Sequence, residues 1–269
     1  RYDVRGMRYT CGTLAVGSRL YVCAYDYDYD WPGRPRYKLD GDKPVPIGAE
    51  ASLVDSVSRM AGVAGIMNSE DGGKTWKNIP GPNTPRFFGP RFGCPSFVQF
   101  GPGYTGLPAW LDGWVYAVSN DESWETGNHV WLARAPKDRV QDRSAWQFFA
   151  SPGATQQANW VAEEERANPI LSYHGHVGHP TMTYVRGLDR FMLATFSDRM
   201  PHSIATPLAV AAKTWHRARE LCLFESATPW GPWALVHHEP FWEGTHVAYL
   251  PHLPSKWFSA DGRSGWLLF

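Results

Sequence analysis

The chain has 269 residues, of which 43% are apolar and 19% are charged, so it is long enough to bury a sizeable core. Its 26 basic residues equal its 26 acidic residues, and this balance produces no net field that would favour nucleic acid or an anionic membrane. No apolar run approaches the roughly 18 residues that a membrane-spanning helix needs, so membrane insertion is not expected.

The first expected elements are two strands, 8–15 and 19–25, that form a hairpin turning at Gly17. The register of a two-residue turn puts Cys11 and Cys23 on opposite faces of this hairpin. The four cysteines of the chain are therefore interpreted as free, buried thiols, and no spacing resembles a zinc site. The sequence predicts no metal and no cofactor, and it does not assign a redox compartment.

The loop after this hairpin alternates carboxylate and aromatic side chains from Asp26 and Asp28 to Trp31. It resembles the start of a calcium-binding loop, but Trp31 stands where glycine is needed and Tyr37 stands where the final glutamate would be. The other two interpretations are a loop that faces a sugar and a solvated acidic loop.

Five residues fill, in order, the positions of an Asp-box, the S-x-D-x-G-x-T-W turn between the two outer strands of a propeller blade: Ser69, Asp71, Gly73, Thr75 and Trp76. A short Asp side chain accepts hydrogen bonds from its own turn, and glycine adopts backbone angles that a Cβ forbids. The alternative is a generic glycine-rich hairpin loop. The motif predicts a propeller. Its role is structural, and it takes no part in catalysis.

The rest of the chain repeats a pattern of paired short strands, at 95–100 and 113–118, at 180–185 and 189–196, and at 256–259 and 264–269. A further strand in each complete unit begins at a tryptophan, namely Trp76, Trp146 or Trp233. One helix is expected within a loop, over 207–219.

Four short strands per unit are typical of a β-propeller. A β-sandwich would also supply short strands, but it would not place a tryptophan at the head of every fourth strand. We therefore expect an all-β chain that forms a single propeller domain over 1–269, with about three and a half blades of a five-bladed ring, truncated at both ends.

Propeller topology sorts the loops onto two faces, and the long ones share the face where ligands usually bind. These long loops are 26–60, 80–93, 119–128, 150–179, 197–218 and 238–255. Long loops inside a compact domain tend to be functional.

Acidic side chains follow an inner strand on that face. Asp121 and Glu122, with Trp124 close behind, come directly after the strand at 113–118. Side chains at this place can point to the propeller axis, where they would serve chemistry or sugar binding. A solvated loop is the alternative.

Histidines precede the innermost strand of the next unit. His174, His176 and His179 lead into Pro180. They suit hydrogen bonding to a substrate, a metal site or a purely structural role, and the sequence identifies no facing cluster of acids that would complete a metal site.

Several blocks of the chain resemble one family: FGCPSFVQFG at 92–101, VWLARAPKDRV at 130–140, SAWQFF at 144–149, FESATPWGPW at 224–233 and PSKW at 254–257. It is the bacterial and fungal domain-of-unknown-function family of glycoside-hydrolase-like five-bladed propellers, which includes endo-D-arabinanases. The similarity runs from about residue 6 to residue 269, and PWGPW is its most specific piece. It implies a propeller that acts on a furanose-containing polysaccharide.

The resemblance and the loops together predict a glycoside hydrolase, which needs two carboxylates across the sugar. The candidate catalytic residues are Asp26, Asp28, Asp121 and Glu122, with Asp121 preferred. The candidate substrate-binding residues are His174, His176, His179, Trp124, Lys256 and Trp257, and all of these are expected to converge on one pocket.

The alternative function is a non-catalytic carbohydrate-binding or scaffold propeller that uses the same face. In either case the expected partner is a polysaccharide or oligosaccharide, with no nucleic acid. An extracellular or cell-surface location is expected.

Overall fold

The structure is a computed structural model, and it describes residues 8–27, 36–40, 43–47, 60–81, 84–121, 127–152, 158–198, 219–240, 242 and 248–269. In these residues the regular elements are β-strands and three-residue 3-10 turns, so the expected all-β class is confirmed. No helix among them is long and apolar enough to cross a membrane. The helix expected over 207–219 lies outside the described residues except for Arg219, which begins a strand.

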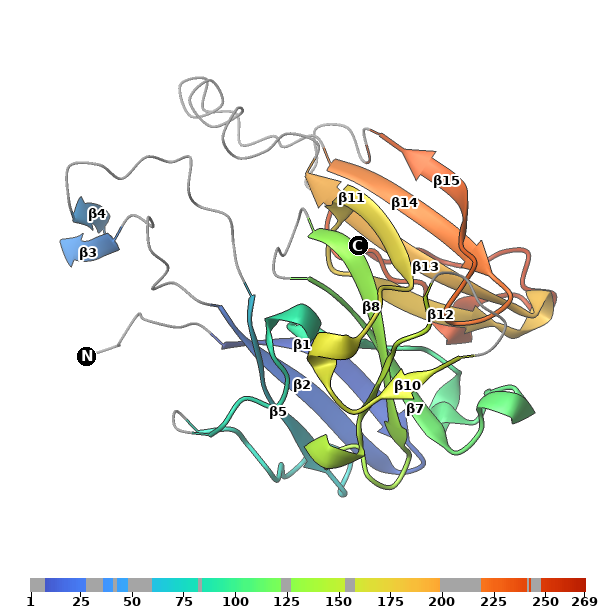
Figure 1. The fold of residues 1–269 in the computed structure, drawn as a ribbon, viewed down its shortest axis with the longest axis horizontal. Helices are drawn as coiled ribbons and strands as arrows, with labels where there is room; N and C mark the ends of the chain where they lie inside the picture. Colours follow the sequence, from blue (N-terminus) through green and yellow to red (C-terminus); the bar gives the residue numbers. More distant parts are fainter. Residues whose placement is uncertain are drawn as a thin grey trace.

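Three antiparallel sheets follow one another along the chain (Figure 1). The first has the order β1-β2-β5, with β1 at Arg8–Val16, β2 at Arg19–Tyr27 and β5 at Met60–Ser69. The second has the order β10-β9-β8-β7-β6, with β6 at Ser96–Phe97, β7 at Trp114–Asn120, β8 at Gly127–Pro136, β9 at Gln147–Phe149 and β10 at Trp160–Val161. In that sheet β11 (Leu171–Val177) also pairs with β8.

The third sheet has the order β12-β13-β14-β15, with β12 at Thr181–Val185, β13 at Arg190–Asp198, β14 at Arg219–Ser226 and β15 at Ala234–Glu239. A separate hairpin pairs β3 (Arg36–Asp40) with β4 (Lys43–Ile47). The 3-10 turns are Pro90–Phe92, Pro102–Tyr104, Ala109–Leu111, Arg143–Ala145, Glu164–Arg166, Arg186–Leu188 and Ser255–Trp257.

Apart from β11, each strand of a large sheet pairs with the next strand of that sheet along the chain, as in a meander. Trp146 and Trp233 directly precede β9 and β15, and Trp76 directly precedes Lys77, whose backbone pairs with Asn68 of β5. The described strands form separate sheets that do not close on themselves, so the number of blades stays a prediction.

The first hairpin contains a β-bulge that moves a cysteine to the other face. Val16 pairs with Arg19, as a two-residue turn requires, but the register shifts between Thr10 and Thr13. The shift places Cys11 opposite Cys23 and inserts one extra residue into β1. The prediction that these two cysteines lie on opposite faces was therefore wrong, because a bulge changes which side chains share a face.

The turn at Ser69–Trp76 is held by its own side chains. The Asp71 carboxylate accepts the Thr75 backbone N–H at 2.9 Å and the Thr75 hydroxyl at 2.6 Å. Ser69 Oγ accepts the Gly73 N–H at 2.9 Å, and the Trp76 indole N–H donates to the Gly73 carbonyl at 3.1 Å. Gly73 has a φ of 88°, a conformation that favours glycine.

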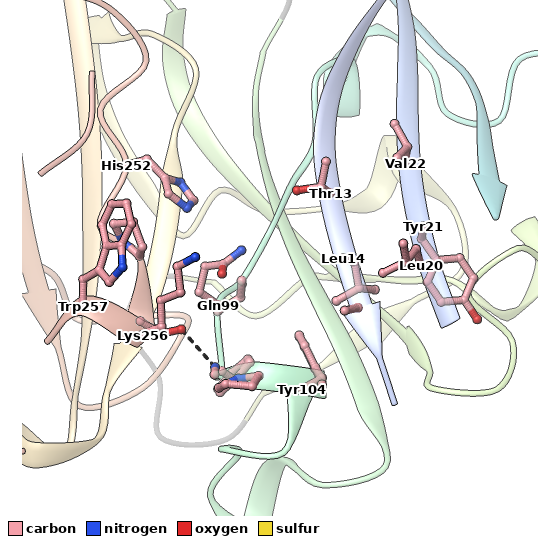
Figure 2. A pocket seen from close by; sticks show the side chains of 18 of the residues that line it. Thr13, Leu14, Leu20, Tyr21, Val22, Gln99, Tyr104, His252, Lys256 and Trp257 are labelled. Atoms are coloured by element: carbon pink, nitrogen blue, oxygen red, sulfur yellow. Dashed lines mark hydrogen bonds between the residues drawn. The ribbon is translucent and has the colours of Figure 1, made fainter. Parts of the chain in front are cut away.

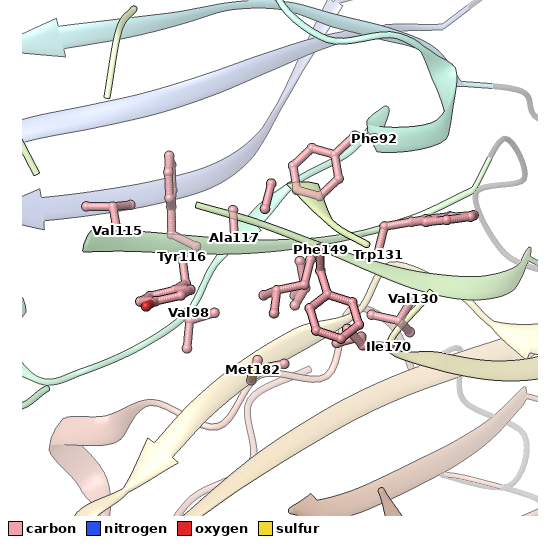
Figure 3. Close-up of a cluster of buried hydrophobic side chains, with 14 of the residues drawn as sticks. Phe92, Val98, Val115, Tyr116, Ala117, Val130, Trp131, Phe149, Ile170 and Met182 are labelled. Carbon is pink, nitrogen blue, oxygen red and sulfur yellow. The ribbon is translucent and has the colours of Figure 1, made fainter. Parts of the chain in front are cut away.

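The main core cluster takes side chains from all three large sheets, including Met182 of β12, and is rich in aromatic rings (Figure 3). Phe88 makes edge-to-face contacts with Phe92, Trp146 and Phe148, at ring-centroid distances of 5.1, 5.1 and 5.7 Å. All four side chains are almost completely buried. Burying each such ring contributes about 1.5–3 kcal/mol, so this cluster is a major source of the attraction between the sheets.

Candidate functional site

A buried carboxylate stands at the end of the third sheet where β13 finishes and β14 starts. Glu220 is the second residue of β14 and is paired with Ser197 of β13. Its side chain is only 1% exposed, and Ser197 Oγ donates a hydrogen bond to Oε1. A buried charge needs such partners, because its desolvation is otherwise costly.

Two histidines cover this carboxylate from different strands. His176 of β11 contacts Oε1 through Nδ1, and His238 of β15 contacts Oε2 through Nε2 at 2.9 Å. Their side chains are 39% and 36% exposed, so each imidazole lies between the buried charge and solvent. His176 belongs to a strand of the second sheet, so the contact also joins two sheets.

These hydrogen bonds determine the protonation of the group. Burial raises the pKa of Glu220, but the hydrogen bonds from Ser197, His176 and His238 lower it and prevail, so its pKa lies below the ordinary value. An ionised carboxylate only accepts hydrogen bonds, so Nδ1 of His176 and Nε2 of His238 carry protons. Within the described part of the chain, no protein group hydrogen-bonds the second nitrogen of either ring, so both nitrogens are open to a ligand.

A tyrosine fixes the orientation of the first imidazole. The rings of Tyr173 and His176 stack at a centroid distance of 4.3 Å and an interplanar angle of 22°. Tyr173 also meets Phe224 of β14 edge to face at 5.9 Å. The carboxylate on one side and the aromatic ring on the other hold His176 in one pose, which is how a binding or proton-transfer group is preorganised.

One subset of this cluster has the composition of a metal centre. Glu220, Cys222 and His238 place ligand atoms within 4.8 Å of one another. Burial and then the charge of Glu220 raise the pKa of the Cys222 thiol to about 12, so the thiol keeps its proton. Glu220 already accepts hydrogen bonds from Ser197, His176 and His238, so these contacts account for its buried charge without an ion.

Asp121, the preferred catalytic residue, closes the turn between β7 and β8. One of its carboxylate oxygens accepts the Asn128 N–H at 2.8 Å and the His129 N–H at 3.5 Å. The Asn128 side-chain oxygen in turn accepts the N–H of Gly175 at 3.0 Å. Gly175 lies between His174 and His176, so the structure connects Asp121 to the histidine strand as neighbouring parts of one surface.

His174 lies on that surface and His179 does not. The His174 ring is 5.5 Å from the ring of His129, whose Nδ1 is 3.0 Å from Ser172 Oγ. His179 is buried, at 5% exposed, in contact with Cys11 and the backbone of Cys94.

Lys256 and Trp257 line a separate cavity of about 670 Å³. In Figure 2 they lie on one side of it with Gln99, and the β1–β2 hairpin forms the other side. Trp76 also lines this cavity, which therefore adjoins the Ser69–Trp76 turn. Among the described residues, its lining includes none of the predicted histidines and not Asp121, so the predicted residues do not form one pocket.

The other predicted catalytic and binding residues lie wholly or partly outside the described part of the chain. Asp28, Glu122 and Trp124 lie outside the described residues. The backbone of Asp26 belongs to β2 and pairs with Arg8 and Gly62, but its side chain is not described.

Glu220 itself was missed from the sequence, because it follows the segment interpreted as a helix. A usable signal was present: a single carboxylate begins the otherwise apolar run Leu221–Phe224. A charge at the head of a buried strand requires partners, and such groups concentrate at functional sites.

Comparisons with known proteins give one family and distant structural similarities. A search of curated proteins finds no match. A proposed hydrolase from Bacteroides ovatus has a crystal structure similar to this chain at a TM-score of 0.50 and 13% identity, covering 97% of this chain and 53% of that one. At this identity the similarity concerns the fold alone.

Two further structures are more distant. A complex of BT0996 with RGII has a TM-score of 0.46 and 13% identity, and a protein named only as a glycoside hydrolase has 0.46 and 12%. Each match covers 94% of this chain and 64% of the other. The chain thus spans between about half and two thirds of the length of these structures.

The family match covers most of the chain. The domain of unknown function DUF4185 matches residues 53–248, which include the core cluster around Phe88 as well as Asp121, His176, Glu220 and His238. The chain belongs to the DUF4185 family.

Proposed function

We propose that this chain is the glycan-binding part of a glycoside hydrolase that acts on a furanose-containing polysaccharide, in the manner of an endo-D-arabinanase. The observation that carries the proposal is the pair of imidazoles that buried Glu220 holds at the surface, connected through Asn128 to Asp121. Preorganised imidazoles can exchange hydrogen bonds with sugar hydroxyls and transfer protons near neutral pH.

In this proposal Glu220 is a positioning residue. Both of its oxygens are already engaged, so it acts by keeping His176 and His238 oriented. Glycoside hydrolysis needs two carboxylates flanking the bond. Asp121 is the proposed first one, and the second is expected from Glu122, Asp26 or Asp28.

The proposed architecture is a five-bladed β-propeller. The three consecutive meander sheets and the Ser69–Trp76 turn, interpreted as an Asp-box, support it. We further propose a secreted or cell-surface location, since polysaccharides of this kind lie outside the cell.

A non-catalytic carbohydrate-binding propeller is the second candidate. It is favoured by the observation that Asp121 already accepts backbone N–H groups and so serves the turn. A turn-closing carboxylate has less freedom to meet a glycosidic bond than one that faces a ligand.

The experiment measures both turnover and binding in the full-length protein. Product release from arabinan is followed for the wild type, Glu220→Gln and Asp121→Asn, and affinity for arabino-oligosaccharides is measured by calorimetry. The hydrolase predicts product release that both variants reduce. Binding by the wild type without product release supports the binding propeller. If the wild type neither binds the oligosaccharides nor releases products, both candidate functions are wrong.

A further inference from the structure

The cavity of about 670 Å³ has walls that are fixed to each other. One wall is the β1–β2 hairpin, and the segment 252–257 supplies the opposite wall (Figure 2). The 3-10 turn Pro102–Tyr104 lines the cavity and contacts both walls: one of its carbonyls accepts the Gly17 N–H at 3.0 Å, and the preceding Gly101 N–H donates to Ser255 Oγ at 3.1 Å. The cavity is therefore preformed, and its volume lies in the range of roughly 300–1,000 Å³ that is usual for small-molecule sites.

The lining of this cavity contains a single charged group, and it is a cation. Among the described residues that line the cavity, Lys256 is the one with a full charge, and none is acidic. Within the described part of the chain, the Lys256 ammonium has no carboxylate partner, and Nζ lies 5.0 Å from the ring centroid of Trp257. Burial lowers the pKa of His252, so its imidazole is neutral at neutral pH and adds no second charge. A lone cation in such a cavity attracts an anionic ligand.

Neutral hydrogen-bonding groups stand beside this cation. In Figure 2 the side chains of Gln99 and His252 lie on the same side of the cavity as Lys256, and Thr13 of β1 lies across from them. Among the described residues, no protein group hydrogen-bonds the Gln99 amide or the His252 imidazole. An amide, a neutral imidazole and a hydroxyl can each donate and accept, so these groups suit a ligand that carries several hydroxyl groups.

The backbone that carries these polar side chains is held by neighbouring segments. The Gln99 N–H donates to the Met182 carbonyl at 2.9 Å, and the Gln99 carbonyl accepts the Tyr184 N–H at 3.0 Å. His252 exchanges two backbone hydrogen bonds with Leu268, each of 2.8 Å. Because both residues are held in place before any ligand arrives, their free side chains are preorganised to bind one.

The remainder of the lining is mostly apolar and includes an accessible aromatic ring. Leu14, Tyr21 and Phe100 are buried side chains of the walls, whereas Trp257 is 41% exposed. The C–H groups of a sugar ring carry a slight positive charge and pack on the negative face of an aromatic ring. A ligand with several negative charges would need several cations, because desolvated charges need partners, and this lining has one. The lining thus fits a ring with hydroxyl groups and a single negative charge.

We propose that this cavity is a second glycan site, which binds a sugar residue that carries a carboxylate, a uronate. Lys256 pairs with the carboxylate, and the side chains of Gln99 and His252 hydrogen-bond the ring hydroxyls. Trp257 packs against one face of the sugar ring. The site is separate from the surface that carries His176, so the proposal does not rest on the proposed hydrolase activity.

The test measures the binding of an oligogalacturonate to the full-length protein by calorimetry. The fully methyl-esterified oligomer is the matched neutral ligand, because it keeps the sugar rings and linkages and loses the charge. We expect the acid to bind and the ester to bind at least about tenfold more weakly. Added salt should weaken the binding of the acid alone. No binding of the acid, or equal affinity for the two oligomers, would overturn the proposal.

Benzoate is the second control ligand, since it carries a carboxylate and a flat ring but no sugar hydroxyl. We expect the protein to bind benzoate more weakly than the oligogalacturonate, because benzoate leaves Gln99 and His252 without partners. Benzoate that binds as tightly as the oligogalacturonate would show that the cavity takes an apolar acid, and the assignment to a uronate would be wrong.

Two variants of the cavity are compared with two matched controls. Lys256→Met removes the charge and keeps a long side chain, and its control is Lys74→Met, at an exposed lysine outside the cavity lining. Trp257→Ala removes the aromatic ring, and its control is Trp110→Ala, at a tryptophan that is 54% exposed and also outside the lining. We expect both cavity variants to lose at least about tenfold in affinity for the oligogalacturonate and both controls to keep it, with all four folded by circular dichroism. Unchanged affinity in folded Lys256→Met would refute the site.

A further variant separates this site from the surface of the proposed hydrolase. His176→Ala changes that other surface, so it should bind the oligogalacturonate as the wild type does. If His176→Ala lost this affinity while Lys256→Met kept it, the acid would bind at the histidine instead, and the cavity would not be its site. A lack of product release from arabinan would count against the hydrolase alone, because arabinan carries no charge and the cavity is tested by binding.

Discussion

At the scale of the residue, the important feature is a carboxylate whose charge is kept inside the protein. Glu220 is 1% exposed and receives hydrogen bonds from Ser197, His176 and His238. Removing the carboxylate would leave its hydrogen-bond donors without an acceptor. A substitution at Glu220 that keeps the side-chain shape therefore tests the role of its charge.

We expect Glu220→Gln to destabilise the protein although it preserves the side-chain shape. The amide N–H₂ would face a donor of Ser197 or of a histidine, so at least one charge-assisted hydrogen bond is lost, at about 2–3 kcal/mol. Thermal unfolding should shift down by several degrees. His237→Ala is the matched control on β15, and an equal loss in it would argue against a specific role of Glu220.

The same variant should remove a pH dependence. Because the pKa of Glu220 is lowered in the folded state, its charge stabilises the fold above the unfolded pKa of about 4.3. This stabilisation is lost as the pH falls through the folded pKa. The difference in unfolding free energy between wild type and Glu220→Gln should be largest near neutral pH and shrink below about pH 4. If this difference in unfolding free energy stayed constant down to about pH 3, the charge of Glu220 would not be the source of the stabilisation.

At the scale of the element, the sequence predicts the turns well and the bulge poorly. The strands of the first hairpin and the Ser69–Trp76 turn follow from local chemistry, namely Gly17 at the hairpin and an aspartate that bonds its own backbone. The bulge at Cys11–Gly12 depends instead on Pro95, which is far away in sequence and lies against Gly12. Local register rules therefore fail where a tertiary contact selects the backbone.

We expect Asp71→Ala to lower the melting temperature and leave ligand affinity unchanged. Hydrogen bonds from Thr75 and Ser69 lower the pKa of Asp71 to about 2, so its ionised carboxylate is the acceptor that closes the turn. Glu70→Ala in the same turn is the control, since Glu70 makes exposed ion pairs with Arg19 and Lys77, and such pairs contribute little. Loss of ligand affinity without loss of stability would show that the Ser69–Trp76 turn contributes to the binding site.

At the scale of the whole molecule, the sequence predicts the all-β class and the order of strands but not the meeting points of distant segments. Trp146 and Trp233 each stand directly before a strand, so the starts of these two strands could be predicted from the sequence. Glu220 with His176, and Cys94 with His179, are brought together by packing between sheets, which no spacing in the chain records. Site residues from one loop can be predicted from sequence, whereas those from several sheets cannot.

The aromatic cluster around Phe88 within the core should behave as one cooperative unit. Phe88 contacts Phe92, Trp146 and Phe148, and it belongs to the segment that bridges to Val63 of β5. Phe88→Ala should cost about 3–5 kcal/mol because the cavity cannot collapse in a tightly packed cluster. Chemical denaturation measures this loss, and Phe87→Ala, a less buried neighbour, is the control. A loss below about 1 kcal/mol would mean that the sheets are held elsewhere.

The two candidate surfaces of the molecule can be separated by one set of variants. His176 lies on the surface with Asp121, whereas Trp257 lines the cavity beside Trp76. If the proposed hydrolase uses the histidine surface, Asp121→Asn and His176→Ala should reduce turnover on arabinan at least about a hundredfold, which corresponds to about 2.7 kcal/mol in the barrier. Trp257→Ala should stay within a few fold of the wild type in kcat/KM, and all three should remain folded by circular dichroism. The opposite pattern, in which Trp257→Ala abolishes turnover and His176→Ala does not, would place the substrate in the 670 Å³ cavity instead.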